Sequence, residues 1–444
     1  MYHPEVETKS QGEIQEIQLQ RLIETVERVY NNVPFYKEKF DELNVKPSDI
    51  KSLEDLRKLP FTKKKDLRDN YPTGLFAVPM SDVVRIHGSS GTSGKPTIVG
   101  YTKKDIEIWS EIVARAITAA GGSSEDIFHN AYGYGLFTGG VGLHYGAEKL
   151  GAAVIPVSGG NTDRQVTLIQ DFKPRGIAGT PSYILNVAEK MEKLKITPET
   201  NGIEYGIFGA EPWTEEMRKT IEDKLKIKAV DIYGLSEVMG PGVAIECHEA
   251  QQGLHIAEDH FLVEIIDPET LELLPDGEDG ELVITTLTKE ALPVIRYRTG
   301  DITSLNRAKC VCGRTMARMA RVKGRTDDMM IIRGVNVFPS EIERELLKID
   351  KLSPFYQIHL LKKGNMDAVE LQVEVNSSLY EEVGCNLQHP IVLQLEKKIL
   401  HAIKNACLIS VDVAIKAPME LPRFESKAIR LVDRRNEQRE EAVK

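Results

Sequence analysis

The sequence predicts an α/β protein with a large N-terminal domain, residues 1–326, and a small α+β C-terminal domain, residues 327–444. In the first half of the chain, short apolar segments alternate with amphipathic helical segments, which favours mostly parallel sheets covered by helices. After about Gly240, strand-like segments follow one another with turn signals between them, which indicates a β-rich subdomain. The length of 444 residues suits about three structural units.

The chain is expected to begin with a helical section. Apolar residues recur at helical spacing within Glu13–Asn44, and Pro34 interrupts the pattern. Amphipathic helices are expected next, at Ser52–Asp66 and Lys103–Ala120. The short buried strands of the predicted parallel sheet are Val83–Ile86, Ala153–Val157, Gly176–Ala178, Ile203–Phe208 and Val230–Tyr233.

The β-rich part and the C-terminal domain follow. Strands are expected at Phe261–Ile266, Gly280–Thr286 and Val294–Arg298, and the joint between the domains at Gly324–Asp328. The expected elements of the C-terminal domain are a helix at Ser340–Ile349, strands at Gln357–Lys362 and Glu370–Val375, and a helix at Gln394–Asn405.

Composition and segment patterns exclude several classes of protein. The net charge of −10 gives no basic surface for duplex nucleic acid. The uncharged run His129–Ala147 resembles a membrane span in length, but its six glycines and two histidines favour a loop-rich pocket wall, so no transmembrane helix is predicted. Met1–Gln15 lacks the apolar core of a secretory signal, so we expect a cytoplasmic protein.

A glycine-rich segment, His87–Thr97, follows the predicted strand Val83–Ile86 and has the composition of a phosphate loop. Its glycines let successive backbone N–H groups turn towards a polyphosphate, while Ser, Thr and Lys side chains add donors. It is not a Walker A motif, because five residues separate Gly88 from Gly94 and Pro96 replaces the magnesium-binding hydroxyl. A magnesium ligand must therefore come from elsewhere. The alternative is an ordinary surface loop.

Four further motifs follow in order: Phe208-Gly-Ala-Glu-Pro-Trp213, Tyr233-Gly-Leu-Ser-Glu237, Tyr297-Arg-Thr-Gly-Asp301 and Gly324–Gly334. With the glycine-rich segment and His144-Tyr-Gly-Ala-Glu148, this order resembles the adenylate-forming enzymes, the superfamily of acyl-CoA synthetases, nonribosomal adenylation domains and luciferases. The resemblance is closest to the phenylacetate-CoA ligases and covers nearly the whole chain.

The resemblance implies ATP-dependent ligation of a carboxylic acid to coenzyme A. It assigns the β and γ phosphates of ATP to Ser89, Ser90, Gly91, Thr92, Ser93, Gly94 and Lys95. It places Ala210 and Glu211 along the adenine with Tyr233 packed beside it, and counts Gly234 and Ser236 among the nucleotide-binding residues. Glu237 is a hard carboxylate suited to Mg²⁺. Asp301 would accept both ribose hydroxyls, and Arg325 would lie near the ribose and the α-phosphate. Standing alone, Glu237 at a helix start and Asp301 in a turn would be structural residues.

Near the C-terminus, Glu425–Asp433 matches the segment in which the superfamily carries its adenylation lysine, which selects Lys427. An ammonium on a long stem is suited to bridge a substrate carboxylate and the α-phosphate as charge builds between them. The resemblance also implies that the C-terminal domain is a mobile lid. It would swing about Asp327, remove Lys427 and bring coenzyme A to the acyl-adenylate.

The cysteines suggest a metal site. The chain has five, an odd and small number that favours reduced thiols or a metal over a disulfide framework. Cys310 and Cys312 flank one residue, and with Cys247 and His255 they would make a closed Cys₃His structural zinc site. His248 is a rival fourth ligand, and cysteines without metal are the alternative.

The acyl group is expected to contact an aromatic and glycine-rich stretch that contains Tyr132, Tyr134, Gly135, Phe137 and Thr138. Such a stretch suits a flat apolar ring, although it is also common in ordinary cores. We therefore expect an aryl acid, with phenylacetate as the first choice, and ATP, Mg²⁺ and coenzyme A as the other small molecules. Family resemblance suggests a homodimer. The alternatives are an adenylyltransferase that needs no coenzyme A and a catalytically silent nucleotide-binding protein.

Overall fold

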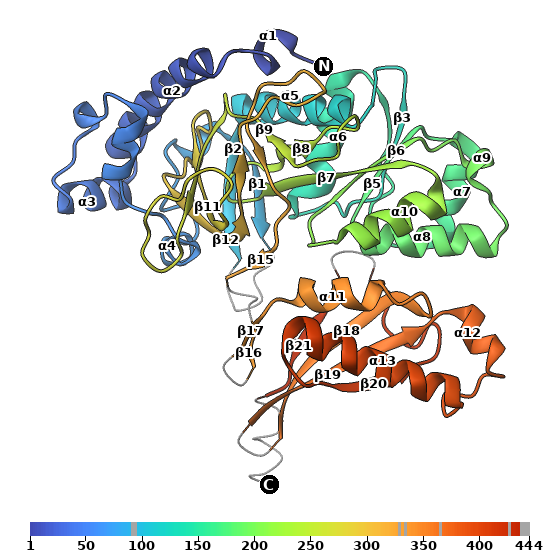
Figure 1. The fold of residues 1–444 in the computed structure, drawn as a ribbon. Helices are drawn as coiled ribbons and strands as arrows, with labels where there is room; N and C mark the ends of the chain where they lie inside the picture. The colour runs from blue at the N-terminus through green and yellow to red at the C-terminus, as the bar shows by residue number, and fades with distance from the viewer. Residues whose placement is uncertain (90–95, 327–329, 333–334, 364–365, 425–427, 436–444) are drawn as a thin grey trace.

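The computed structural model describes residues 1–89, 96–326, 330–332, 335–363, 366–424 and 428–435, and within these ranges nine strands form the main sheet (Figure 1). Their spatial order is β13-β14-β9-β8-β7-β6-β5-β3-β4. The strands are β3 (Ile127–Asn130), β4 (Ala153–Ile155), β5 (Gly176–Gly179), β6 (Tyr205–Gly209), β7 (Lys228–Leu235), β8 (Gly240–Glu246), β9 (Leu254–Ile256), β13 (Leu305–Asn306) and β14 (Arg318–Met319).

Strands β4, β3, β5, β6 and β7 pair in parallel, and the strands beyond β7 extend the sheet antiparallel. Helices cover both faces because successive side chains of a strand point to opposite sides. In β6, Ile207 joins the core that contains Ile112 of α5, whereas Phe208 joins the core that contains Leu185 of α8. The covering helices are α5 (Lys103–Ala119), α6 (Thr138–Leu150), α7 (Thr162–Phe172), α8 (Pro181–Lys193) and α10 (Glu215–Leu225).

A second, antiparallel sheet of β10 (Phe261–Ile266), β11 (Gly280–Thr286), β12 (Tyr297–Thr303) and β15 (Gly324–Arg325) lies beside the first. The hairpin of β1 (Val83–Ser89) and β2 (Thr97–Thr102) is separate from both sheets. The N-terminal helices are α1 (Pro4–Glu7), α2 (Gln11–Asn32) and α3 (Pro34–Glu42). Helix α2 is fixed by two side chains, since Gln18 donates to the Glu258 carbonyl at 2.8 Å and Thr25 to the Leu287 carbonyl at 3.0 Å.

The C-terminal part forms its own sheet and core (Figure 1). The sheet order is β20-β19-β18-β21. The elements are β16 (Met330–Ile332), β17 (Val335–Val337), α11 (Pro339–Leu347), β18 (Leu352–Lys363), β19 (Met366–Val375), α12 (Ser377–Glu382), α13 (Pro390–Cys407), β20 (Asp412–Lys416) and β21 (Leu431–Asp433). Leu347 of α11 packs against the core beneath α8 and α10, so the two parts are in contact.

The predicted α/β class with a separate α+β C-terminal part is confirmed. Three local expectations were wrong. Ser52–Asp66 is not one helix, because Pro60 separates a 3-10 helix (Leu53–Lys58) from α4 (Lys64–Asp69). The strand at Val83–Ile86 belongs to the β1–β2 hairpin rather than to the parallel sheet. His129–Ala147 is loop only in part: residues 131–137 are loop, but α6 begins at Thr138, and its glycines allow it to pack closely on Trp109 and Val113.

Within the part of the chain that the structure describes, every helix is too short or too polar to span a lipid bilayer.

Candidate active site

A cavity of about 570 Å³ opens beside the carboxyl ends of β6 and β7. Ligands of open α/β sheets bind at this edge, and the volume lies in the range of small-molecule sites. The cavity brings together segments that are far apart in the sequence. Its lining includes Lys63, Lys64, Ser89, Tyr132, Phe137, Thr138, Ala210, Gly234, Ser236, Glu237, Thr299 and Arg325.

Ser89 ends β1 at one side of this cavity, and its Oγ is buried without a hydrogen-bond partner among the described residues. An unpartnered buried hydroxyl fits a site that a polar ligand completes, because leaving such a group unpaired costs free energy. The other members of the predicted phosphate loop, residues 90–95, lie outside the described residues.

Glu237 follows β7 and is 4% exposed. The Lys64 Nζ lies 3.8 Å from its Oε1, so an anion and a cation are paired in the wall of the cavity. Lys64 was not among the site residues expected from sequence, since lysine pairs are ordinary on surfaces. Its position depends on Thr62, which is fully buried, donates to the Ile295 carbonyl at 2.7 Å and contacts the Tyr36 hydroxyl at 2.9 Å.

Asp301 and Arg325 lie opposite each other on β12 and β15. The Arg325 Nη1 donates to Asp301 Oδ1 at 2.6 Å, and the Tyr233 hydroxyl donates to Oδ2 at 2.6 Å. Burial, followed by the charge of Asp301, raises the pKa of Tyr233 well above its usual value, so the phenol stays a donor. A carboxylate offers about four acceptor positions and can therefore accept from several donors at once.

A smaller cavity of about 160 Å³ continues the first and shares Ala210, Gly234 and Arg325 with it. Trp213 lines this cavity, with the Arg321 guanidinium 4.4 Å from its ring centroid. Asp231 of β7 also lines it, and burial raises the pKa of its carboxyl to about 6. Asp231 was not expected from sequence, because it stands within a strand among buried neighbours.

Ala210 and Glu211 follow β6 at the edge of this smaller cavity. Ala210 has a φ of 68°, which turns the chain away from the sheet. The Glu211 carboxylate is engaged by backbone amides: Oε1 accepts from the Ser182 N–H at 2.8 Å, and Oε2 accepts from the Ala428 N–H at 2.9 Å. Lys427 lies outside the described residues, but Ala428 is its neighbour in the chain.

The predicted acyl stretch is divided by the structure. Tyr132, Phe137 and Thr138 line the larger cavity, and Thr138 Oγ1 lies 3.0 Å from Ser236 Oγ. Tyr134 and Gly135 are not among the described residues that line it. The Tyr134 hydroxyl instead lies 3.2 Å from His144 Nδ1 of α6, and burial raises its pKa to about 12.

Cys247, His255, Cys310 and Cys312 form a separate cluster, with one ligand atom from each lying within 4.8 Å of all the others. The Cys247 and Cys310 sulfurs are 3.7 Å apart, and Cys312 Sγ lies 3.5 Å from His255 Nε2. Zinc bonds in a tetrahedron would place two sulfurs about 3.8 Å apart and a sulfur and a nitrogen about 3.6 Å apart. The donor set therefore fits zinc. His248 is outside the cluster, and its Nδ1 lies 3.1 Å from the Ala119 carbonyl.

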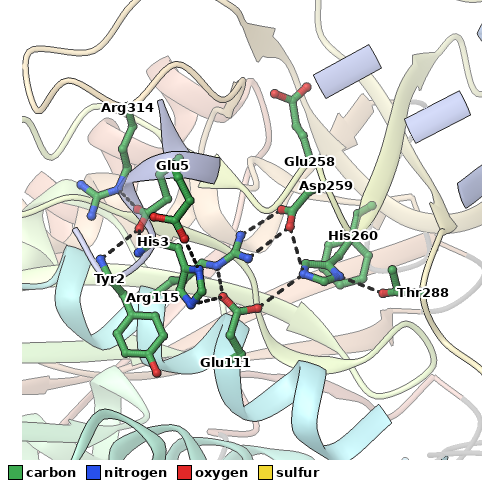
Figure 2. Close-up of polar contacts among 12 residues, drawn as sticks. Tyr2, His3, Glu5, Glu111, Arg115, Glu258, Asp259, His260, Thr288 and Arg314 are labelled. Carbon is green, nitrogen blue, oxygen red and sulfur yellow. Dashed lines mark hydrogen bonds and ion pairs between the residues drawn. The ribbon is translucent and has the colours of Figure 1, made fainter. Parts of the chain in front are cut away.

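Figure 2 shows polar contacts around the N-terminal segment, among them those of Arg314, which is close in the chain to two of the cysteines. Arg314, two residues after Cys312, pairs with Glu7 at 2.5 Å, and Thr315 N donates to the Glu7 carbonyl at 3.1 Å. Nearby, Arg115 of α5 donates to both oxygens of Asp259 at 3.0 and 3.1 Å. The loop that carries two of the cysteines is thus also the anchor of the first helix.

Comparisons with known proteins agree along most of the chain. A family model described as AMP-binding enzyme matches residues 15–288, and one described as AMP-binding enzyme C-terminal domain matches residues 334–435. The chain is 51% identical over 439 residues to a phenylacetate-coenzyme A ligase of Thermus thermophilus, covering 97% of this chain and 99% of the relative. It is 54% identical over 433 residues to a phenylacetate-coenzyme A ligase of Escherichia coli, covering 97% of each chain.

Two solved structures of one protein, a 2-hydroxyisobutyryl-CoA ligase, match to different degrees. Its postadenylation state in complex with 2-HIB-AMP matches with a TM-score of 0.91 at 28% identity, covering 99% of this chain and 94% of that chain. Its thioesterification state, in complex with 2-HIB-AMP and CoA, matches with a TM-score of 0.72 at 29% identity over the same shares.

Proposed function

The chain belongs to the AMP-binding enzyme family and, within it, to the phenylacetate-coenzyme A ligases, and on this premise we propose that its acid substrate is phenylacetate. It is an AMP-forming acid–CoA ligase that uses ATP and forms an acyl-adenylate. The choice of an aryl acid depends on one observation: Tyr132 and Phe137 line the same cavity as Glu237. An aromatic ring packs favourably against aromatic side chains.

The first step activates the acid. A carboxylate resists attack by thiols because its carbonyl is electron-rich and oxide is a poor leaving group. A carboxylate oxygen therefore attacks the α-phosphorus of ATP, the bond to the β-phosphate breaks, and pyrophosphate leaves. We assign the stabilisation of the developing charge to Arg325, Lys64 and Lys427. Glu237 would hold Mg²⁺, which supplies charge neutralisation for the phosphates when bound.

The second step transfers the acyl group. The sulfur of coenzyme A attacks the acyl carbon of the adenylate, the bond to the phosphate oxygen breaks, AMP leaves, and the thiol proton passes to solvent. We propose that residues 327–444 act as a lid that turns about Asp327 between the steps. Supporting this, the chain superposes better on the postadenylation state than on the thioesterification state of the 2-hydroxyisobutyryl-CoA ligase. The arrangement described above would then be the one that makes the adenylate.

An assay of ATP-dependent AMP release tests this function. Phenylacetate, benzoate, acetate and 2-hydroxyisobutyrate are compared, each with and without coenzyme A, and the thioester is identified by mass. We expect the highest kcat/KM with phenylacetate and continuous AMP release only with coenzyme A. Equal turnover without coenzyme A would instead support an adenylyltransferase, and preference for an aliphatic acid would overturn the choice of substrate.

We also propose that Cys247, His255, Cys310 and Cys312 hold a structural zinc ion. The closed set of four protein donors leaves no position for substrate. The metal would therefore link the end of β8, strand β9 and the loop 310–312 to one another. The fit of the donor separations to a zinc tetrahedron supports this.

Metal analysis tests the zinc proposal. Cys310→Ser should reduce bound zinc from about one per chain to near zero and lower the unfolding temperature. The matched control is Cys385→Ser, which changes an exposed cysteine of the C-terminal part and should retain the metal. Zinc absent from the unmodified protein purified without chelator, or retained in Cys310→Ser, would refute the site.

A homodimer and a cytoplasmic location, expected from family resemblance and from the pattern of Met1–Gln15, stay predictions.

A further inference from the structure

Glu211 joins the two parts of the molecule through its carboxylate, and we propose that it is a positioning residue that holds the Lys427 segment in place for adenylate formation. The inference rests on the proposed role of Lys427. Glu211 is expected from sequence to line the adenine, yet its oxygens accept backbone N–H groups from Ser182 and Ala428. Ala428 follows Lys427 directly in the chain, and its amide is held by Glu211 at 2.9 Å.

The carboxylate of Glu211 is itself firmly held. Glu211 is 8% exposed and is followed by Pro212. Ser182 occupies the first turn of α8, where the N-cap residue Thr180 makes no side-chain capping bond, so Glu211 supplies the missing acceptor. The Ser182 N–H in this first turn fixes the orientation of the Glu211 carboxylate. Its second oxygen is then a fixed, charged acceptor for the Ala428 N–H.

The far end of the same segment belongs to the C-terminal sheet. Strand β21 begins at Leu431 and pairs in parallel with β18, and the Ile358 N–H donates to the Arg430 carbonyl at 2.7 Å. Arg430 also lies over the Tyr356 ring at 4.4 Å. Residues 428–433 are therefore held at one end by the C-terminal part and at the other by Glu211 of the N-terminal part.

The hydrogen bond from the Ala428 N–H to Glu211 can form only when the C-terminal part is in the position described here. A rotation of the C-terminal part carries β21 with β18 but separates Ala428 from Glu211. Glu211 thus stabilises the arrangement in which the adenylate forms and makes no corresponding contribution once the lid has turned. Losing one hydrogen bond to a charged acceptor corresponds to about ten- to a hundredfold in rate.

Measuring adenylate formation and thioester formation separately distinguishes a positioning role of Glu211 from a role in folding or adenine binding. We expect Glu211→Ala to slow adenylate formation, measured by phenylacetate-dependent pyrophosphate exchange, about ten- to a hundredfold. Thioester formation from supplied phenylacetyl-adenylate and coenzyme A should stay within about twofold, and the Kd for ATP should not change. Glu211→Gln retains one carbonyl acceptor and should recover part of the loss. Glu216→Gln is the matched control, since its charge also lies near Glu343 but it makes no hydrogen bond to Ala428 among the described residues.

A double-mutant cycle completes the test. If Glu211 acts through Lys427, then Glu211→Ala should have little further effect on single-turnover adenylation in a Lys427→Ala background. Additive losses, an equal loss in both half-reactions, or a weakened Kd for ATP would overturn the inference in favour of a folding or adenine-binding role. Failure of the proposed function is distinguishable, because the unmodified enzyme itself would then show no pyrophosphate exchange.

Discussion

Replacing Glu374 by Gln should strongly destabilise the C-terminal part, because this carboxylate organises the loop that leads to Lys427. Glu374 of β19 is fully buried. Its oxygens accept from the Leu421 N–H at 2.6 Å, from the Met419 N–H at 3.2 Å, and from Arg423 Nη1 and Nη2 at 2.9 and 2.7 Å.

The magnitude follows from what the substitution leaves behind. Gln keeps the shape but removes the charge, so the Arg423 guanidinium, which stacks 3.4 Å from the Phe355 ring centroid, loses its counter-ion in a buried site. Breaking one partner of such a pair costs about 3–5 kcal/mol. Glu382→Gln is the control within the same part. Glu382 pairs with Lys351 at 2.9 Å, but both side chains are about half exposed, so we expect a cost below about 1 kcal/mol.

Native-state hydrogen exchange of the full chain measures both costs locally. Peptides from β18 and β19 should exchange about two to nearly four orders of magnitude faster in Glu374→Gln, the equivalent of about 3–5 kcal/mol, while peptides from β5 to β7 stay unchanged. If protection in β18 and β19 fell no further than in Glu382→Gln, the carboxylate would not organise the loop and the reasoning would be refuted.

Three further predictions concern the site and the contact between the two parts. Lys427→Ala should lower pyrophosphate exchange to a small residual rate, detectable only in single-turnover measurements, but largely spare thioester formation from supplied acyl-adenylate; equal loss of both would contradict its role. Asp301→Asn removes the charge that holds Tyr233 and Arg325 and should raise the Kd for ATP about ten- to a hundredfold, measured by calorimetry, with an unchanged Kd counting against a ribose role. Burial, opposed by Arg430, raises the pKa of Glu343 to about 7 from 4.5. The folded form therefore holds the proton more tightly, and the stability from Glu343 is full below pH 4.5 and lost as the pH rises to about 7, by about 3 kcal/mol. Glu343→Gln should remove this pH dependence in thermal unfolding curves, and an unaltered dependence would refute the assignment.

Local sequence patterns predicted four strands of the parallel part of the main sheet. The expected strands near residues 153–157, 176–178, 203–208 and 230–233 correspond to β4, β5, β6 and β7; β5 and β6 are buried throughout and are short apolar runs. Strand β3, between β5 and β4, was missed, because half of Ile127–Asn130 is polar. Local patterns do not predict which strands pair with one another. Val83–Ile86 has the composition of a buried strand, yet it pairs with Thr97–Thr102 across the glycine-rich loop. Periodicity does not determine pairing.

In the candidate site too, residues within motifs were predictable from sequence, whereas residues placed by distant contacts were not. Ordered motifs predicted that Ser89, Glu237 and Arg325 share one cavity, and they do. The use of Glu211 was not predictable, because its amide partners are separated from it by 29 and 217 residues and any residue except proline offers such an N–H. Lys64 was missed for a similar reason, since its place depends on Thr62 being buried against a distant strand.

Both tryptophans of the chain belong to its N-terminal part, so tryptophan fluorescence originates in that part alone. Trp109 and Trp213 both precede residue 326, and Trp213 stands in the wall of the smaller cavity beneath the Arg321 guanidinium. Tryptophan fluorescence is therefore a reporter of nucleotide arrival, whereas the C-terminal part contains no tryptophan of its own. In a stopped-flow experiment, tryptophan fluorescence of the unlabelled protein should report ATP binding. A fluorescent dye attached to the exposed Cys385 would report separately on the C-terminal part.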